Sequence, residues 1–313
     1  ECLPMNRKIV VIGSCLTATV VVCRRMPLGG ETVVADRMYE SLGGKGLNMA
    51  IQAARLGASV VFIGVVGDDA GGSACEAALK GASVRTDYLL KLPGKRTGHG
   101  VILRDEYGSN AIAVDPGATR AFSHEIIEAA GDVFDTRTVV LTQLEIPLQT
   151  AIHGCRLAHR LGATTILNPA PAQDLRNQSL QSVDILTPNE TESPVCAGEV
   201  SGGGRSDHRR FAGQLIVAGC GAVIVTRGSE GSVLYRKATP PEYVAAFPVA
   251  AVDTTGAGDS YNASLAVALA EEEPIDSAMR KASAASALSC TREGTVTAYP
   301  DRPAVSRFLC QFS

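Results

Sequence analysis

The segment with the clearest chemical potential runs from Ala251 to Asn262 and reads Ala-Val-Asp-Thr-Thr-Gly-Ala-Gly-Asp-Ser-Tyr-Asn. Two glycines, Gly256 and Gly258, precede the acid Asp259, and an apolar run with helical character follows at 263–270. The first turn of a helix offers unpaired N–H groups and the positive end of the helix dipole, so it can bind a phosphate. A carboxylate beside that phosphate can take a proton from an attacking alcohol. The segment therefore predicts a kinase.

In this interpretation the catalytic groups are one side chain and three backbone donors. Asp259 is the general base, and the N–H groups of Gly256, Ala257 and Gly258 stabilise the charge that develops on the transferred phosphoryl group. The apolar residues at 247–252 predict a strand that leads into the helix. The alternative is an ordinary helix start whose glycines only allow close packing.

A second glycine-rich segment at 42–49, Leu-Gly-Gly-Lys-Gly-Leu-Asn-Met, opens another predicted helix. Gly44 has no side chain and lets the backbone approach a small polar ligand, and Lys45 and Asn48 supply donors that suit sugar hydroxyls. The spacing differs from that of a Walker A loop, which excludes a P-loop NTPase. The alternative is a helix start with a solvated lysine.

Polar residues follow two further apolar runs. Glu145 comes just after the run at 139–144, where a carboxylate needs a partner or a ligand. Asn189 and Glu192 are three residues apart at a predicted helix start, so both can face phosphates and a hydrated Mg²⁺. The alternatives are a helix cap or surface acid for Glu145, and a plain capped helix start for the Asn189 and Glu192 pair.

Short β-branched runs that alternate with helical patterns must position these residues. This alternation predicts an α/β fold with a central, mostly parallel sheet flanked by helices, and ligands beyond the carboxyl ends of its strands. We expect a single domain over 5–313, in which the segments 17–42 and 97–114 break the alternation and form projecting hairpins. The predicted strands are Ile9–Ile12, Val60–Val66, Val139–Leu144, Thr164–Leu167, Val183–Leu186 and Ala222–Thr226.

Composition narrows the class of partner and compartment. The 313-residue chain is 45% hydrophobic and carries a net charge of −3, so no long-range field recruits nucleic acid or an anionic membrane. The apolar run at 9–23 is too short to span a bilayer and is better explained as a buried strand than as a signal peptide. Nine scattered cysteines without metal-binding spacing predict reduced thiols in a cytoplasmic protein, which in a eukaryote would reach the nucleus as well.

Taken together, these motifs resemble the ribokinase-like carbohydrate kinases of the PfkB family, over nearly the whole chain. The resemblance rests on 251–262, on Gly-Gly-Lys-Gly-Leu-Asn at 43–48, on Pro-Leu-Gly-Gly-Glu-Thr at 27–32, and on the segments at 187–192 and 226–231. It implies ATP-dependent phosphorylation of a sugar, with the 5-hydroxyl of D-ribose as the expected acceptor. It also implies that the two projecting hairpins form a small β lid over the sugar and the contact of a homodimer.

The resemblance assigns individual positions to the substrates. Sugar contacts are expected from Leu16, Ala18, Gly44, Lys45, Asn48, Glu145 and Asp259. ATP contacts are expected from Asn189, Thr226, Gly228, Ser229, Gly231, Gly258 and Ser283.

The resemblance also assigns two metal sites. Glu192 would act on Mg²⁺ through water, and a K⁺ ion would stiffen the phosphate-binding turn. The expected K⁺ ligands are Asp253, Ser289 and the backbone carbonyls of Thr255, Arg292 and Gly294, while Ala298 stands where many members offer a serine hydroxyl.

The sequence departs from the family at the end of the first strand. Members of the family typically have an aspartate at this place, and bacterial members also have an asparagine two residues earlier. This chain has Ala18 in place of the aspartate and Leu16 in place of the asparagine. A charged hydrogen bond to a sugar hydroxyl contributes about 1.5–3 kcal/mol. Its loss weakens binding roughly ten- to several-hundred-fold per bond. The alternatives are a compensating group, another sugar or nucleoside as substrate, or an impaired protein that binds sugar without turnover.

Overall fold

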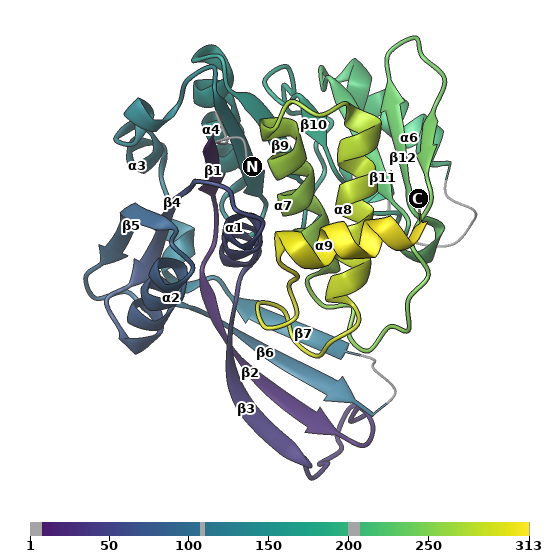
Figure 1. The fold of residues 1–313 in the computed structure, drawn as a ribbon. Coiled ribbons are helices and arrows are strands. Elements are labelled where there is room, and N and C mark those ends of the chain that lie inside the picture. Colours follow the sequence, from purple (N-terminus) through teal and green to yellow (C-terminus); the bar gives the residue numbers. More distant parts are fainter. Residues whose placement is uncertain (1–7, 107–109, 200–206, 313) are drawn as a thin grey trace.

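The computed structural model describes residues 8–106, 110–199 and 207–312, which form a large sheet between two layers of helices and a smaller sheet at one end (Figure 1). In spatial order the large sheet contains β13 (Glu242–Val244), β12 (Ser232–Arg236), β11 (Ala222–Thr226), β10 (Ile185–Leu186), β9 (Thr164–Asn168), β8 (Thr138–Gln143), β1 (Lys8–Ile12), β4 (Val60–Gly67) and β5 (Arg85–Leu92).

The large sheet is parallel from β11 to β5, and its two antiparallel pairs are β11–β12 and β12–β13 at one edge. Strand β1, inside this sheet, pairs Val10 with Val61 of β4 on one side and with Val140 of β8 on the other. All three valines are buried, as expected for a parallel sheet that is covered on both faces. The predicted α/β fold with a central, mostly parallel sheet is confirmed.

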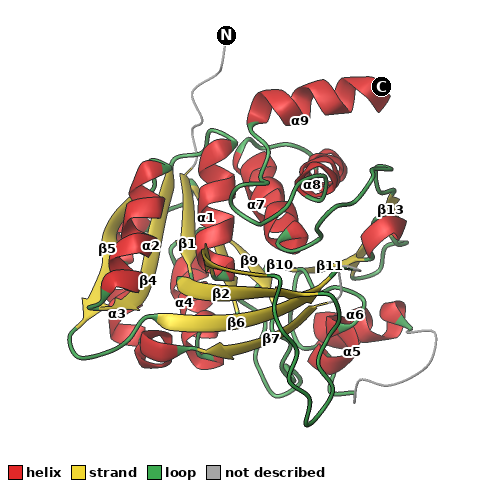
Figure 2. Ribbon diagram, turned by 90° about the horizontal axis from the view of Figure 1, so that it is seen from below, coloured by secondary structure: helices red, strands yellow, loops and turns green. Residues whose placement is uncertain are grey.

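Two groups of helices cover the faces of this sheet (Figures 1 and 2). One face carries α1 (Lys45–Arg55), α2 (Ala70–Gly81), α7 (Ala257–Ala270), α8 (Ile275–Ser289) and α9 (Arg302–Leu309). The other carries α3 (His124–Glu128), α4 (Leu148–Arg160), α5 (Glu192–Cys196) and α6 (His208–Val217).

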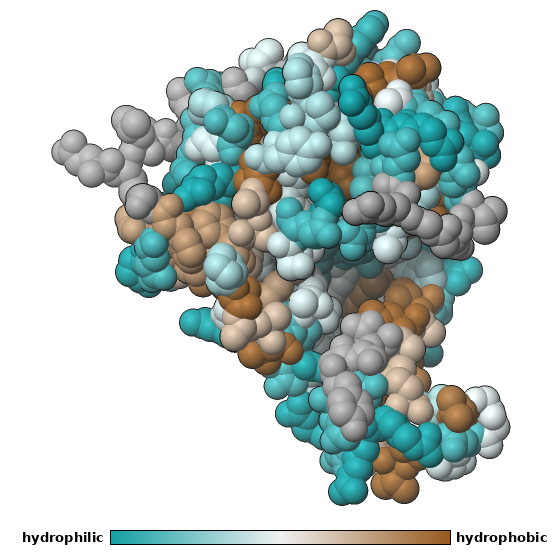
Figure 3. Space-filling view, turned by 90° about the vertical axis from the view of Figure 1, so that its right-hand side faces the viewer, coloured by the Kyte–Doolittle hydropathy of each residue, from teal (hydrophilic) through white to brown (hydrophobic). Residues whose placement is uncertain are grey.

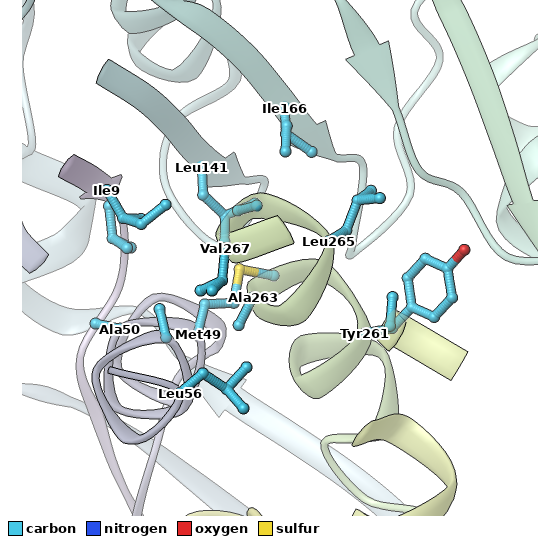
Figure 4. Close-up of a cluster of buried hydrophobic side chains, with 14 of the residues drawn as sticks. Ile9, Met49, Ala50, Leu56, Leu141, Ile166, Tyr261, Ala263, Leu265 and Val267 are labelled. Carbon is cyan, nitrogen blue, oxygen red and sulfur yellow. The ribbon is translucent and has the colours of Figure 1, made fainter. Parts of the chain in front are cut away.

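Helices α1 and α7 pack against each other as well as against the sheet. Figure 4 shows Met49 and Ala50 of α1 beside Ala263 and Val267 of α7, with Leu141 of the central sheet close by. All of these side chains are buried. This packing fixes the start of each helix relative to the other, and the polar residues described below lie at those two starts.

The smaller sheet has four strands, in the order β3 (Arg37–Gly43), β2 (Leu16–Cys23), β6 (Gly98–Asp105) and β7 (Asn110–Asp115). Pairs β2–β3 and β6–β7 are antiparallel, whereas β2 and β6 run parallel. It projects from the body below the start of α1, and Figure 3 shows apolar side chains among the polar ones on this projection. Its strands lie in the two segments that break the alternation in the sequence, of which 107–109 fall outside the described residues.

The predicted strand at 247–252 is wrong. The last strand before α7 is β13, which ends at Val244, and 245–256 have no regular structure. Pro248 has no N–H for a strand ladder, and the side chain of Val252 is 56% exposed. The N–H groups of Val252 and Asp253 bond instead to the carbonyl of Cys290, at 2.7 and 3.2 Å, which attaches this loop to the end of α8.

The end of β1 touches the start of α1 backbone to backbone. A methyl group on Gly46 would lie 2.6 Å from the backbone nitrogen of Ser14 and 2.8 Å from the carbonyl carbon of Gly13. The N–H of Leu47 also donates to the carbonyl of Ser14 at 2.9 Å. Glycine at position 46 therefore allows the polar start of α1 to lie directly over the end of β1.

We expect Gly46→Ala to lower the free energy of unfolding by about 1–3 kcal/mol or more, because rigid backbone atoms surround the added methyl group. Gly43→Ala is the matched control, since a methyl group there meets no atom within 4 Å. Urea unfolding of both variants measures the difference. Equal stability of the two would contradict the close approach of α1 and β1.

Candidate active site

Asp259 lies in the first turn of α7 with a side chain that is almost completely buried. Its Oδ2 accepts a hydrogen bond from Nδ2 of Asn48 at 2.8 Å, and its Oδ1 is 3.9 Å from Nζ of Lys45. Both partners come from the first turn of α1. The packing of α1 on α7 thus brings two sugar-binding candidates to the candidate base.

Burial raises the pKa of Asp259 to about 6, although the charge of Lys45 and the hydrogen bond from Asn48 act in the opposite direction. The negative charge of Glu145 adds to the increase. A carboxyl group whose pKa is near the working pH is ionised at neutral pH and accepts a proton more readily than an ordinary aspartate. The surroundings of Asp259 therefore suit a general base.

Glu145 holds the backbone of the same turn. Its Oε2 accepts from the N–H of Lys45 at 2.7 Å and from Oγ of Ser14 at 2.5 Å. Gln143 donates from Nε2 to Oγ of Ser14 at 2.9 Å, and its Oε1 accepts from the N–H of Glu145. Ser14 and Gln143 are further polar residues of this site that were not predicted from the sequence. Both are polar residues at or just after the end of a buried strand, the signal that identified Glu145.

Two cavities meet at Asp259. The larger, of about 1000 Å³, lies between the small sheet and the body, and the smaller, of about 770 Å³, lies beyond the ends of β9 to β11. Lys45, Gly256 and Asp259 line both. The predicted sugar-binding residues that line the larger one are Leu16, Ala18, Gly44, Lys45, Asn48, Glu145 and Asp259.

Strand β2 of the small sheet contributes the apolar side chains of Ala18 and Val20 to the lining of the larger cavity. Ala18 and Val20 on β2 alternate with Thr17 and Thr19, and the threonines bond instead to the imidazole of His99 at 2.7 and 3.0 Å. Ala18 is buried and pairs with Ser41 across the sheet. The side chain of Ala18 therefore faces the larger cavity from β2.

The residues that were predicted to contact the nucleotide line the smaller cavity. Its lining includes Asn189, Thr226, Gly228, Ser229, Gly231, Gly258 and Ser283. Strand β11 and the turn after it supply four of these residues, and α8 supplies Ser283.

Asn189 and Glu192 form a reciprocal helix cap and also line the smaller cavity. Oδ1 of Asn189 accepts from the N–H of Glu192 at 2.8 Å, while the N–H of Asn189 donates to Oε2 of Glu192, also at 2.8 Å. Burial raises the pKa of Glu192. These two bonds are those of the capped helix start that is the alternative interpretation of this pair.

The turn before α7 is held from three sides. Gly256 has a left-handed φ of 78°, and its carbonyl accepts from the hydroxyl of Tyr299 at 3.2 Å. Asn262 donates to the carbonyl of Gly258 at 2.8 Å and accepts from the hydroxyl of Thr187 at 2.6 Å. The N–H of Ala257 is bonded to the carbonyl of Thr254 at 3.2 Å, so the predicted role of that donor requires a shift of the turn.

Two of the residues predicted to hold K⁺, Thr255 and Gly294, bond to the carboxylate of Asp253. Its Oδ1 accepts from the N–H of Thr255 and its Oδ2 from the N–H of Gly294, both at 3.0 Å. Within the described ranges, Ser289, Arg292 and Ala298 lie outside the linings of both cavities.

In the part of the chain that the structure describes, no three His, Cys, Asp or Glu side chains come together in a way that could hold a metal ion. No described helix is long and apolar enough to cross a membrane. The eight described cysteines are free thiols, and Cys2 lies outside the described residues.

Comparison with known proteins gives the class of this protein. Residues 6–302 match the family described as pfkB family carbohydrate kinase. The chain is 37% identical to a ribokinase from Bacillus subtilis, over 97% of this chain and 99% of the relative. It is 33% identical to a deoxyribokinase from Salmonella typhi, with coverages of 96% and 98%. An Arabidopsis thaliana ribokinase solved in complex with ribose and ATP has a TM-score of 0.85 at 32% identity, covering 97% of this chain and 98% of that one.

This chain therefore belongs to the pfkB family of carbohydrate kinases, and the resemblance seen in the sequence is confirmed.

The buried carboxylate predicts an unusual stability effect. With a folded pKa of about 6 and an unfolded value near 3.9, ionised Asp259 costs up to about 3 kcal/mol above pH 6, and the cost disappears below about pH 4. We expect Asp259→Asn to raise the melting temperature at pH 7.5 and to lose this advantage in acid. Asp253→Asn is the control with the opposite sign, because hydrogen bonds lower the pKa of Asp253 despite its burial. A loss of stability in Asp259→Asn at pH 7.5 would contradict the burial cost.

Proposed function

We propose that this protein transfers the γ-phosphoryl group of ATP to the 5-hydroxyl of D-ribose, giving ribose 5-phosphate and ADP. One observation carries the proposal: the carboxylate of Asp259, with its raised pKa, lies where a cavity for an acceptor meets a cavity for a nucleotide. The named substrates of the similar ribokinases support the choice of ribose and ATP.

The acceptor lies in the larger cavity, with its primary hydroxyl toward Asp259. Its other hydroxyls are within reach of Lys45, Asn48 and Glu145, which surround the start of α1. Asp259 takes the proton as the hydroxyl oxygen bonds to the γ-phosphorus, and the bond from that phosphorus to the bridging oxygen of ADP breaks. The N-terminus of α7, with the N–H of Gly258, faces the charge on the phosphoryl oxygens.

The nucleotide lies in the smaller cavity, with its phosphates toward α7 and its base toward Ser283 on α8. Mg²⁺ neutralises phosphate charge when bound, and it typically keeps several waters and few protein ligands. Glu192 and Asn189 are the described residues that fit this arrangement, through water, because they line the cavity without forming a protein-only cage.

We further propose that the small sheet is a lid over the sugar and the contact of a homodimer. Exposed apolar side chains on and beside this sheet support the dimer, among them Val34 at 87% and Met38 at 69% exposed. The free thiols in the described part of the chain support a reducing compartment, the cytoplasm.

The first prediction from this function concerns the base. We expect Asp259→Asn to lower kcat by about 10²–10⁴-fold and to leave ATP affinity largely unchanged, because only proton transfer is lost. Asp276→Asn is the matched control, since Asp276 is an exposed acid in the first turn of α8. Coupled ADP-release kinetics and nucleotide titration measure both. Near-normal turnover in Asp259→Asn would exclude this residue as the base.

The second prediction concerns Ala18, which offers no acceptor to sugar hydroxyls. We expect Ala18→Asp to lower the KM for D-ribose roughly tenfold or more, because a carboxylate adds at least one charged hydrogen bond. Ala18→Asn separates the effect of charge from that of side-chain size. The unchanged protein should discriminate less than Ala18→Asp between D-ribose and 2-deoxy-D-ribose, as measured by the ratio of their kcat/KM values.

Other outcomes at Ala18 have a defined meaning. A low KM for ribose that the substitution leaves unchanged would show that another group holds those hydroxyls. Turnover of a nucleoside but not of ribose would replace ribose as the acceptor. ATP binding without turnover of any sugar or nucleoside would indicate a non-catalytic binding protein.

A further inference from the structure

Two arginines of the small sheet reach across the larger cavity to acids on the body. Arg104 on β6 donates from one terminal nitrogen to Oδ2 of Asp253 at 3.0 Å, and the same nitrogen is 3.4 Å from Oε1 of Glu293. Arg37 on β3 donates to that Glu293 oxygen at 2.8 Å. Figure 1 shows the small sheet projecting below α7 and α8, and Asp253 lies in the loop before α7 whereas Glu293 lies in the loop after α8.

The pair of Arg104 and Asp253 is well shielded from water. The two side chains are 20% and 9% exposed, whereas Arg37 and Glu293 are 55% and 47% exposed. Ion pairs between exposed side chains contribute little, and a charged hydrogen bond with restricted access to water contributes more. Arg104 therefore forms the stronger of the two links between the small sheet and the body.

Asp253 connects that link to the phosphate-binding turn. Its Oδ1 accepts from the N–H of Thr255, the residue just before Gly256, and its Oδ2 also accepts from the N–H of Gly294. Burial alone raises the pKa of Asp253, but these backbone donors and the charge of Arg104 hold it below its usual value. The position of Asp253 thus determines where the backbone enters the turn before α7.

While Arg104 is bonded to Asp253, the surroundings of this carboxylate do not fit the K⁺ ion that the family resemblance implies. A guanidinium group already donates to Oδ2, and a second positive charge on the same oxygen would be repelled. Ala298, the expected position of a serine ligand, has no side-chain oxygen and is buried. With Arg104 in place, the carboxylate already has the single positive charge that it needs.

We propose that Arg104 is a positioning residue that supplies the positive charge at Asp253 when the small sheet closes, in place of a monovalent cation. Closure over the acceptor and fixation of the phosphate-binding turn then become one event, because the same side chain takes part in both. The proposal rests on the proposed function for its kinetic consequence, and its structural part is independent of the substrate. Arg104 acts on the turn through its hydrogen bond to Asp253.

The test compares the unchanged protein with Arg104→Gln and with Arg37→Gln, which removes a link to Glu293 but none to Asp253. Turnover of D-ribose and ATP is measured in KCl and in choline chloride at equal ionic strength. We expect the unchanged protein and Arg37→Gln to depend little on K⁺. Arg104→Gln should lose about 10–100-fold in kcat in choline and recover most of it in KCl, because K⁺ can then replace the lost charge.

A second readout uses no substrate. KCl, relative to choline chloride, should raise the melting temperature of Arg104→Gln and leave that of the unchanged protein nearly constant. Equal K⁺ dependence in all three proteins, or the same defect in Arg37→Gln and Arg104→Gln, would overturn the proposal. If no protein turns over ribose in any salt, the proposed function fails, and the thermal shifts still decide the role of Arg104.

Discussion

The structure depends on keeping one carboxylate ionised where little water reaches it. Asp259 is almost completely buried, and its charge is tolerated because it sits at the positive end of α7, beside Lys45 and Asn48. Those partners are available only because α1 packs on α7 and begins directly over β1, where Gly46 allows backbone contact with Ser14. Burial of this charge lowers the stability of the fold, and it places a base with a raised pKa between two cavities. Such perturbed pKa values are common at catalytic sites.

The small sheet contacts both the acceptor cavity and the loop that leads into α7. Its apolar wall near Ala18 faces the acceptor cavity, and Arg104, farther along the same sheet, holds the carboxylate of Asp253. Hydrogen bonds from Thr255 and Gly294 to that carboxylate continue into the turn that faces the nucleotide. In this account the choice of acceptor and the shape of the phosphate site are set by one sheet, although the chemistry belongs to α7.

The parts of the fold that could be predicted from the sequence are those with strong local signals. The β-branched runs became the parallel strands, and the motif around Asp259 could be located because glycines and an acid in one turn have few other uses. Ser14 and Gln143 were missed because a polar residue at the end of a buried strand also occurs without any ligand. The apolar residues at 247–252 predict a strand by their hydrophobicity, but Pro248 lacks the N–H that a strand ladder needs, and the segment is a loop. Arg104 lies 149 residues from Asp253, and no local pattern reveals such a pairing.

The central claim is transfer of a phosphoryl group to the primary hydroxyl of ribose, and the most direct test is the position of the new phosphate. D-ribose labelled with ¹³C at carbon 5 would be incubated with ATP and Mg²⁺, and the product examined by ³¹P and ¹³C NMR. The account predicts ribose 5-phosphate, seen as phosphorus coupling to the labelled carbon, with one ADP formed per sugar phosphate. A phosphate on another carbon, or ADP formed without any sugar phosphate, would contradict it.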